Sequence, residues 1–334
     1  MIYQIPKPYV NKLSLLETQK GIKIVKDTFE RKLAKNLNLI RVSAPLFVRP
    51  ETGLNDYLNG VELPVKFNLP NLGCDVEIVQ SLAKWKRYAL GKYHFSEGQG
   101  LYTDMNAIRP FECTDNLHSI YVDQWDWELV ISREDRNLTF LKKIVRLIIK
   151  SLKETHLVLK NEFPVLDLEI NEDIYFITSE ELLQKYPHLS PKEREDAICK
   201  EKKTVFIIGI GDKLSNGIPH DKRSPDYDDW SLNGDILVWY PILSRAVELS
   251  SMGIRVDANS LQEQLIKAQN LDRLQLPFHQ DVIHERLPLT IGGGIGQSRL
   301  CLILLEKFHL CEVQSSTWLE EDLHVLEEMG VNVL

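Results

Sequence analysis

A glycine-rich turn near the C-terminus carries the residues with the clearest chemical potential. Residues Gly294 to Arg299 read Gly-Ile-Gly-Gln-Ser-Arg, between an apolar run at 288–291 and another at 300–305. This pattern predicts a strand that runs through glycines directly into a helix, where a ligand can approach the backbone closely. The guanidinium of Arg299 can hold two phosphate oxygens at once. The turn is a candidate phosphate site, and the alternative is a helix start with a surface Arg.

The two familiar glycine-rich nucleotide motifs do not fit this chain. A dinucleotide fingerprint needs a third glycine near the place of Arg299 and belongs early in a βαβ unit. The P-loop string G-x-x-x-x-G-K-[ST] is missing from the sequence. Any phosphate site at this turn is therefore of a different kind.

Composition narrows the class of protein. The 334 residues are 43% apolar and 26% charged, as in an ordinary globular chain, with a net charge of −8 and a pI near 5.7. An acidic balance disfavours a nucleic-acid-binding protein, whose affinity comes from clustered Lys and Arg. Five cysteines without a C-x-x-C pair suggest neither a disulfide framework nor a zinc site. With no signal-peptide pattern and no run of membrane-spanning length, we expect a cytoplasmic protein with no membrane or nucleic-acid partner.

Two central segments combine strand or helix patterns with dense polar side chains. After Ser81, a plausible helix cap, come Lys84, Lys86 and Arg87, which alone would suggest a basic helix face. Farther on, residues 119–130 alternate as a strand. Gln124, Asp126 and Glu128 share one face, whereas Trp125 and Trp127 share the other and are expected in the core. Polar groups on a strand face call for a polar ligand or water.

A third and a fourth segment are rich in carboxylates. Residues 223–230, Arg-Ser-Pro-Asp-Tyr-Asp-Asp-Trp, interleave acidic and aromatic side chains and could line a site for a charged ligand. Asp235 and Glu248 fall on two neighbouring predicted strands, an arrangement that suits Mg²⁺. Because no Lys or Arg stands near Asp235 on those strands, we expect this pair to hold a metal rather than an ion pair.

The predicted elements indicate an α+β fold. Helices are predicted at 11–37, 83–90, 137–160, 191–200, 260–268 and 296–307. Strands are predicted at 39–44, 64–68, 75–79, 119–130, 174–177, 204–208, 235–240 and 248–256. Their order favours a mixed or antiparallel sheet with helices on it, in one domain spanning 1–334. Pro45 suits a sheet edge or an interface, and the Lys/Glu-rich stretch 185–203 suggests a solvated helical insertion.

Three features of the sequence together resemble the motifs of class II aminoacyl-tRNA synthetase catalytic cores. They are the helix and strand that end at Pro45, the strand–loop–strand around Arg109, and the terminal Gly-x-Gly-x-x-Arg. Segments 81–87, 121–128, 225–230 and 292–299 are more specifically similar to the ammonia-dependent asparagine synthetases, the aspartate–ammonia ligase family. The resemblance runs from about residue 19 to Arg299.

The resemblance implies an antiparallel β-sheet core flanked by helices and a homodimer formed through the first motif. It also implies ATP-dependent amidation of aspartate by ammonia, through a β-aspartyl-adenylate, to give asparagine, AMP and pyrophosphate. Arg109 and Arg299 would hold the phosphates, and Asp235 and Glu248 would hold Mg²⁺. Further ATP contacts are expected at Leu117, Ser119, Tyr227 and Gly294. The residues around aspartate would be Asp56, Ser81, Lys86, Gln124, Asp126, Arg223, Asp228, Ser251 and Arg255.

Three further points concern the residue that takes the proton, the connector before Asn233 and the source of nitrogen. Asp56 and Asp228 are both candidates to take a proton from ammonium. Only Ser231 and Leu232 separate Trp230 from Asn233, a shorter connector than the family leads us to expect. The chain begins Met1-Ile2 and so lacks an N-terminal Cys nucleophile, which makes free ammonia the simpler nitrogen source.

Two other functions remain as alternatives. A truncated aspartyl- or asparaginyl-tRNA synthetase would share the core, but we expect an anticodon-binding segment before the first helix and a less acidic chain. A silent paralogue that only binds ATP or an amino acid would be expected to lose some charged groups. Arg109, Arg299, Asp235 and Glu248 are all present.

Overall fold

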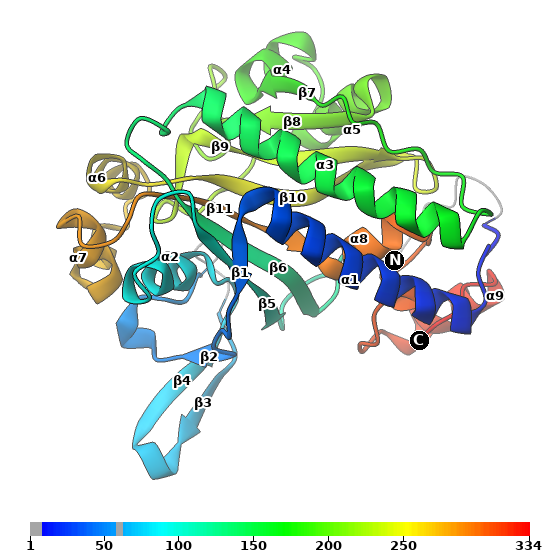
Figure 1. Cartoon of the computed structure of the whole chain (residues 1–334), viewed down its shortest axis with the longest axis horizontal. Coiled ribbons are helices and arrows are strands. Elements are labelled where there is room, and N and C mark those ends of the chain that lie inside the picture. Colours follow the sequence, from blue (N-terminus) through cyan, green and yellow to red (C-terminus); the bar gives the residue numbers. More distant parts are fainter. Residues whose placement is uncertain (1–8, 58–62) are drawn as a thin grey trace.

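The computed structural model describes residues 9–57 and 63–334, so Met1 and Ile2 lie outside the described part of the chain. Figure 1 shows a large twisted sheet with helices on its faces. The helices are α1 Leu15–Leu37, α2 Ala83–Lys92, α3 Leu138–Glu162, α4 Ser179–Lys185, α5 Pro191–Lys202, α6 Ala258–Lys267, α7 Pro277–Ile283, α8 Gln297–Leu304 and α9 Glu320–Glu328. The strands are β1 Leu39–Arg41, β2 Phe47–Val48, β3 Lys66–Leu69, β4 Cys74–Ile78, β5 Gly100–Ile108, β6 Tyr121–Val130, β7 Tyr175–Thr178, β8 Thr204–Ile208, β9 Asp228–Tyr240, β10 Arg245–Arg255 and β11 Thr290–Gly296.

The main sheet is mixed, as the sequence predicts. In the described residues its strand order is β1-β5-β6-β11-β10-β9-β8-β7. The pairs in the centre are antiparallel, and only the outermost pairs, β1 with β5 and β7 with β8, are parallel. Strand β1 is an edge strand of this sheet and ends at Arg41, before Pro45. Strands β2, β4 and β3 form a small second sheet that projects from the molecule in Figure 1.

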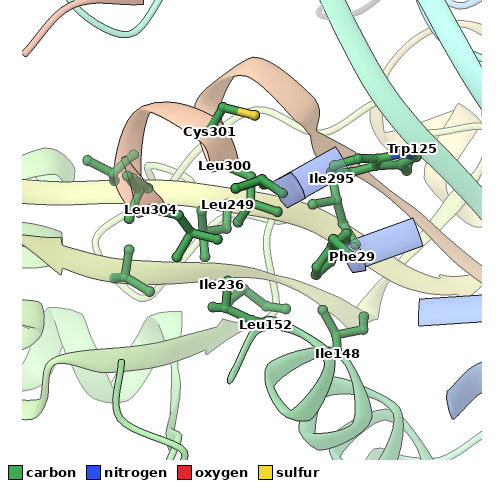
Figure 2. Packing of buried hydrophobic residues seen from close by; sticks show 14 of the residues in the cluster. Phe29, Trp125, Ile148, Leu152, Ile236, Leu249, Ile295, Leu300, Cys301 and Leu304 are labelled. Atoms are coloured by element: carbon green, nitrogen blue, oxygen red, sulfur yellow. The ribbon is translucent and has the colours of Figure 1, made fainter. Parts of the chain in front are cut away.

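The core lies between the sheet and a helical layer on one face. Helices α1 and α3 lie side by side across this face. Figure 2 shows Phe29 of α1 against Trp125 of β6, with their ring centroids 4.9 Å apart. Trp125 and Trp127 are 1% and 0% exposed, so their predicted place in the core is confirmed. The opposite side chains of β6 therefore face away from this layer.

Local sequence signals explain where the two long helices begin. Ser14 and Glu17 form a reciprocal capping box at the start of α1, which satisfies backbone donors there. The Asn137 side chain accepts from the Phe140 amide at the start of α3. The buried residues of α3 recur at helical spacing, from Leu141 to Leu159, so packing on the sheet stabilises the helix.

Two expectations about elements are corrected. The stretch 185–203 is not a solvated insertion, because α5 packs against the sheet and buries Ile198 and Cys199. The residue patterns predict no strand at 100–108, although the strand–loop–strand around Arg109 in the resemblance requires one, and β5 pairs there with both β1 and β6.

The short connector at Ser231 and Leu232 is part of the continuous strand β9. In the described residues no helix is long and apolar enough to cross a membrane.

Candidate functional site

A cavity of about 540 Å³ opens on the face of the sheet away from α1 and α3. Strands β6, β10 and β11 line it, together with the first turn of α2, the 109–119 loop and the 221–228 loop. Sixteen of the seventeen predicted site residues line it: Asp56, Ser81, Lys86, Arg109, Leu117, Ser119, Gln124, Asp126, Arg223, Tyr227, Asp228, Glu248, Ser251, Arg255, Gly294 and Arg299. Asp235 is not among the lining residues. The structure thus brings segments more than 200 residues apart into one hollow.

Strand β11 lines the cavity with glycines. Along β11, Gly292 pairs with Glu128 and Gly294 with Asp126 on β6. A Cβ atom at Gly292 would lie 1.9 Å from Glu128 Oε2, and one at Gly294 would lie 2.4 Å from Gln124 Oε1. Real Cβ atoms do not approach that closely. The glycines therefore leave room for the polar side chains of β6 as well as for a ligand.

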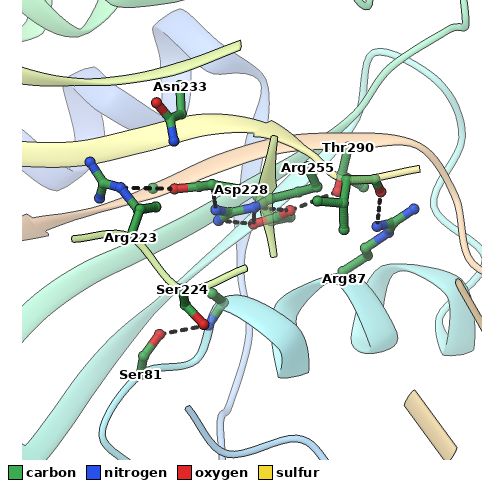
Figure 3. A network of polar contacts seen from close by, with 12 residues as sticks. Ser81, Arg87, Arg223, Ser224, Asp228, Asn233, Arg255 and Thr290 are labelled. Atoms are coloured by element: carbon green, nitrogen blue, oxygen red, sulfur yellow. Dashed lines mark hydrogen bonds and ion pairs between the residues drawn. The ribbon is translucent and has the colours of Figure 1, made fainter. Parts of the chain in front are cut away.

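Glu128 and Arg255 form a fully buried ion pair over Gly292. Arg255 donates from Nε to Glu128 Oε1 at 2.9 Å and from Nη2 to Oε2 at 2.7 Å. Its Nη1 donates to Asp228, which lies between Arg223 and Arg255 in Figure 3. The Thr290 hydroxyl donates to Glu128 Oε1 at 2.7 Å. Each charge in this network has a partner of opposite sign, as burial requires.

The network sets the protonation of its carboxylates in opposite directions. Burial would raise the pKa of Glu128, but Arg255 and Lys86 hold it below its usual value. Burial raises the pKa of Asp228, and the two guanidiniums of Arg255 and Arg223 offset only part of this effect. Asp228 is therefore the more readily protonated of the two.

Lys86 is buried and fully engaged by the protein. Its ammonium donates to Asp126 Oδ1, to the Trp127 carbonyl at 3.0 Å and to the Gly293 carbonyl at 3.0 Å. An ammonium has three donors, so contact with a substrate carboxylate would replace one of these bonds. Asp126 Oδ2 is buried with no hydrogen-bond partner among the described residues. This arrangement presents the second oxygen of Asp126 for a donor from a ligand.

The two arginines that are expected to hold phosphates, Arg109 and Arg299, both line the cavity. Arg299 lies in the first turn of α8 and donates to the carbonyls of Glu248 at 3.0 Å and Leu117 at 3.1 Å. Arg109 follows β5, and its contact with Glu112 is loose at 3.9 Å. Its Nε is buried with no partner among the residues described. The backbone contacts orient the Arg299 guanidinium, and Arg109 keeps donors available.

An anchor that the sequence did not reveal holds the turn before Arg299. Asp123 accepts from the Ser298 amide at 3.0 Å and from its hydroxyl at 2.8 Å. Lys26 of α1 reaches the same carboxylate at 3.1 Å. Asp123 shares the Trp125 face of β6, which the alternation assigned to the core, and no signal in the sequence distinguished it.

The expectation that no basic group lies near Asp235 is wrong. Arg223 Nη2 donates to Asp235 Oδ1 at 2.5 Å, from a loop twelve residues earlier in the chain. Asp235 and Glu248 do lie on the neighbouring strands β9 and β10. Burial and the nearby Asp235 raise the pKa of Glu248, so negative charge is crowded here. No cluster of three or more His, Cys, Asp or Glu residues suited to a metal occurs in the described part of the chain.

Comparison with known proteins places the chain in one group. Residues 16–330 match the family model described as aspartate-ammonia ligase. A protein of that name from Clostridium tetani is 58% identical over 331 residues, covering 99% of this chain and 97% of the relative. One from Clostridium perfringens strain SM101 is 57% identical, covering 99% and 98%. Among solved structures, the asparaginyl-tRNA synthetase of Pyrococcus horikoshii with asparaginyl-adenylate has a TM-score of 0.65 at 15% identity, covering 89% of this chain and 68% of that one. The Entamoeba histolytica asparaginyl-tRNA synthetase has the same TM-score at 13% identity, covering 90% and 67%.

We predict that Glu128→Gln destabilises the fold by about 3 kcal/mol at pH 7, because it leaves a buried guanidinium short of one counter-charge. Urea unfolding monitored by circular dichroism measures this loss. The stabilisation by ionised Glu128 is fully present above pH 4.5, the ordinary pKa of a Glu side chain. It is lost as the pH falls from there through the lowered pKa that Glu128 has in the folded protein. The difference between the two proteins should therefore shrink in acid.

Asp281→Asn is the matched control, because Asp281 pairs with Arg286 on the surface. It should leave stability nearly unchanged. A Glu128→Gln variant as stable as the parent at pH 7 would show that the buried pair does not support the fold.

Proposed function

Because this chain belongs to the aspartate–ammonia ligase family, it catalyses ATP-dependent synthesis of asparagine from aspartate and ammonia, and we propose that the cavity holds both steps. Its fold is that of the class II aminoacyl-tRNA synthetases. The observation that carries the proposal is the convergence of Arg109 and Arg299 with Asp56, Asp126 and Asp228 in one cavity. The cavity thereby combines cations that can bind the phosphates of ATP with carboxylates that can bind an ammonium group.

The first step joins two anions and so needs cations. The aspartate side-chain carboxylate attacks the α-phosphorus of ATP, forming a β-aspartyl-adenylate and releasing pyrophosphate. We propose that Arg109 holds the α-phosphate and the attacking carboxylate, and that Arg299 holds the ATP phosphates. A well-placed donor of this kind contributes about 10²–10³-fold to the rate in comparable sites. Leu117, Ser119, Tyr227 and Gly294 would complete the nucleotide site.

We propose that the substrate aspartate binds in the cavity between Asp126 and Asp228. The partnerless Oδ2 of Asp126 suits the substrate ammonium. Gln124 and Ser251 offer neutral hydrogen-bonding groups nearby, and Lys86 and Arg223 add positive charge for carboxylates. Arg255 contributes by holding Asp228 in place. Ser81 lies in the same wall, before the first turn of α2.

The donor set at Asp235 and Glu248 fits Mg²⁺. Two carboxylates on adjacent strands, with a raised Glu248 pKa, are the kind of pair that Mg²⁺ binds together with substrate phosphates and water. When bound, the ion would neutralise phosphate charge. The Arg223–Asp235 contact means that Arg223 would share this carboxylate with the metal.

We further propose a cytoplasmic homodimer in which residues 1–334 form a single catalytic domain. Ile40 on edge strand β1 is 60% exposed, and Leu46 and Phe47 nearby are also exposed. Such apolar side chains beside an unpaired strand edge support an interface through the first motif. A buried core that extends from Leu13 to Val331 supports one domain.

The test of the reaction is to supply ATP and aspartate to the pure protein with and without ammonium. We expect asparagine, AMP and pyrophosphate in equal amounts only when ammonium is present. Ion chromatography and amino-acid analysis measure the products. Pyrophosphate release without asparagine would retain the adenylate and reject the amide-forming step, and aminoacylation of tRNA without ammonium would favour the synthetase alternative.

The second step requires a base, because ammonium must lose a proton before it attacks the adenylate. We propose that Asp56 or Asp228 takes this proton; both are buried and line the cavity. Burial raises the pKa of Asp228, which makes it a stronger base than a free Asp carboxylate. Release of AMP then leaves asparagine.

We predict that Asp56→Asn and Asp228→Asn each lower asparagine formation by about 10²-fold relative to adenylate formation, because the amide step loses its base. Pyrophosphate exchange into ATP reports the adenylate independently of ammonia. Asp212→Asn, at a surface pair with Lys267, is the control. If both site variants keep the parent ratio of amide formation to exchange, neither carboxylate is the base.

A further inference from the structure

A second buried charge cluster lies behind the cavity rather than in it. Asp226 is 0% exposed and its Oδ2 accepts from Lys84 at 2.9 Å, His279 Nε2 at 2.9 Å and Arg273 at 3.1 Å. Its Oδ1 accepts from the Ser224 hydroxyl at 2.7 Å. Asp226, Lys84, Arg273 and His279 are all missing from the residues that line the cavity. The neighbours of Asp226 on the same loop, Tyr227 and Asp228, do line it.

The contacts of His279 define its protonation state. Burial would raise the pKa of Asp226, but Lys84 and His279 hold it well below the usual range. An ionised carboxylate only accepts, so His279 Nε2 carries the proton in this contact. Burial lowers the pKa of His279 despite the contact with Asp226, which keeps the ring neutral at pH 7. The ring therefore acts as a hydrogen-bond donor held at one orientation.

The helical segment that carries His279 also touches the loop of Asp56. This η3–α7 segment spans residues 271–283. It comprises the 3₁₀ helix η3, Leu271–Gln275, then Leu276, and the helix α7, Pro277–Ile283. A Cβ at Gly53 would lie 2.9 Å from Leu276 Cβ and 3.4 Å from His279 Nδ1. Gly53 has φ +71°, so its backbone geometry also favours glycine there. The loop can approach the segment this closely only because that position lacks a side chain.

Apolar packing strengthens the same contact. Leu54, next to Gly53, packs against the buried cluster that contains Phe278 and Val282 of α7. The backbone on the other side is held by Gln264 of α6, whose Nε2 donates to the carbonyls of Pro225 at 3.0 Å and Asp228 at 2.9 Å. One packed helical unit thus contacts both loops that present a carboxylate to the cavity.

We propose that the η3–α7 segment sets the relative positions of Asp56 and Asp228, and that His279 is its positioning residue. His279 contacts the Asp226 loop through Nε2 and lies against Gly53 through its opposite edge. The inference rests on the proposed function, since the carboxylates of Asp56 and Asp228 are assigned there to the aspartate and ammonium side of the site. Arg109 and Arg299, assigned to phosphates, take their contacts from other elements.

The test is steady-state kinetics of His279→Leu with aspartate and ATP varied separately. We expect the KM for aspartate to rise about tenfold, the effect of losing one charged hydrogen bond, with the KM for ATP within about twofold of the parent. His279→Gln keeps a donor near the Nε2 position and should restore most of the aspartate affinity. His284→Leu is the control, because His284 is exposed at the end of the same helix and contacts only the Gln280 carbonyl in the described structure.

Equal rises in both KM values, or an unchanged KM for aspartate in a folded His279→Leu protein, would overturn the proposal. If His279→Leu does not fold, Arg273→Gln at the more exposed edge of the cluster replaces it. For Arg273→Gln we expect the KM for aspartate to rise about threefold and the KM for ATP to stay unchanged. An unchanged KM for aspartate in this variant would also overturn the proposal. Failure of the unmodified protein to form asparagine would instead refute the proposed function.

Discussion

Burial of Arg255 between Glu128 and Asp228 is the interaction on which the arrangement of the cavity depends. Moving a guanidinium and two carboxylates out of water is costly, and only close pairing with good geometry offsets that cost. The pairing requires Glu128 to lie flat over β11, where any side chain at Gly292 would collide with it. The glycines of β11 and the ion network are therefore one structural feature. Strands β6, β10 and β11 can place charged groups on one face because the other face is filled by Phe29, Trp125 and their neighbours.

This network also bears on the two opposite electrostatic needs of the proposed mechanism. Adenylate formation needs positive charge around phosphates, whereas attack by ammonia needs a carboxylate that can accept a proton. Arg299 lies in the first turn of α8 and Arg109 follows β5, whereas the carboxylates of Asp126 and Asp228 are buried, each held by a buried cation. Because Lys86 and Arg255 are occupied by these carboxylates, they keep the deeper groups oriented without any ligand.

Part of the cavity lining could be predicted from periodic or local signals in the sequence, and the other residues were expected from the family resemblance. Alternation along β6 separated Gln124 and Asp126 from Trp125 and Trp127, and the run of glycines into an apolar helix located Arg299. Contacts between distant segments gave no such signal. The Arg223–Asp235 pair forms across a loop, so the absence of a basic residue on the strands of Asp235 was misleading. The burial of α5 was missed because its apolar residues are few among many charged ones.

Asp226 and Asp228, at the entry to β9, show the limit most clearly. Asp226 and Asp228 have the same chemistry two residues apart, yet one faces His279 and the other faces the cavity. Before β9 begins the backbone has no repeating period, so neither direction follows from spacing. The position of Asp123, which holds Ser298 and Lys26, was hidden for a related reason: strand alternation identifies a face but not the partner that reaches it.

A crystal structure with a non-hydrolysable β-aspartyl-adenylate analogue tests the central claim most directly. The account predicts that its phosphate contacts Arg109 and that its aspartyl ammonium contacts Asp126 Oδ2, with the Glu128–Arg255–Asp228 network unchanged. An analogue bound with its aspartyl group away from Asp126 and Asp228, or one that separates Arg255 from Glu128, would contradict it.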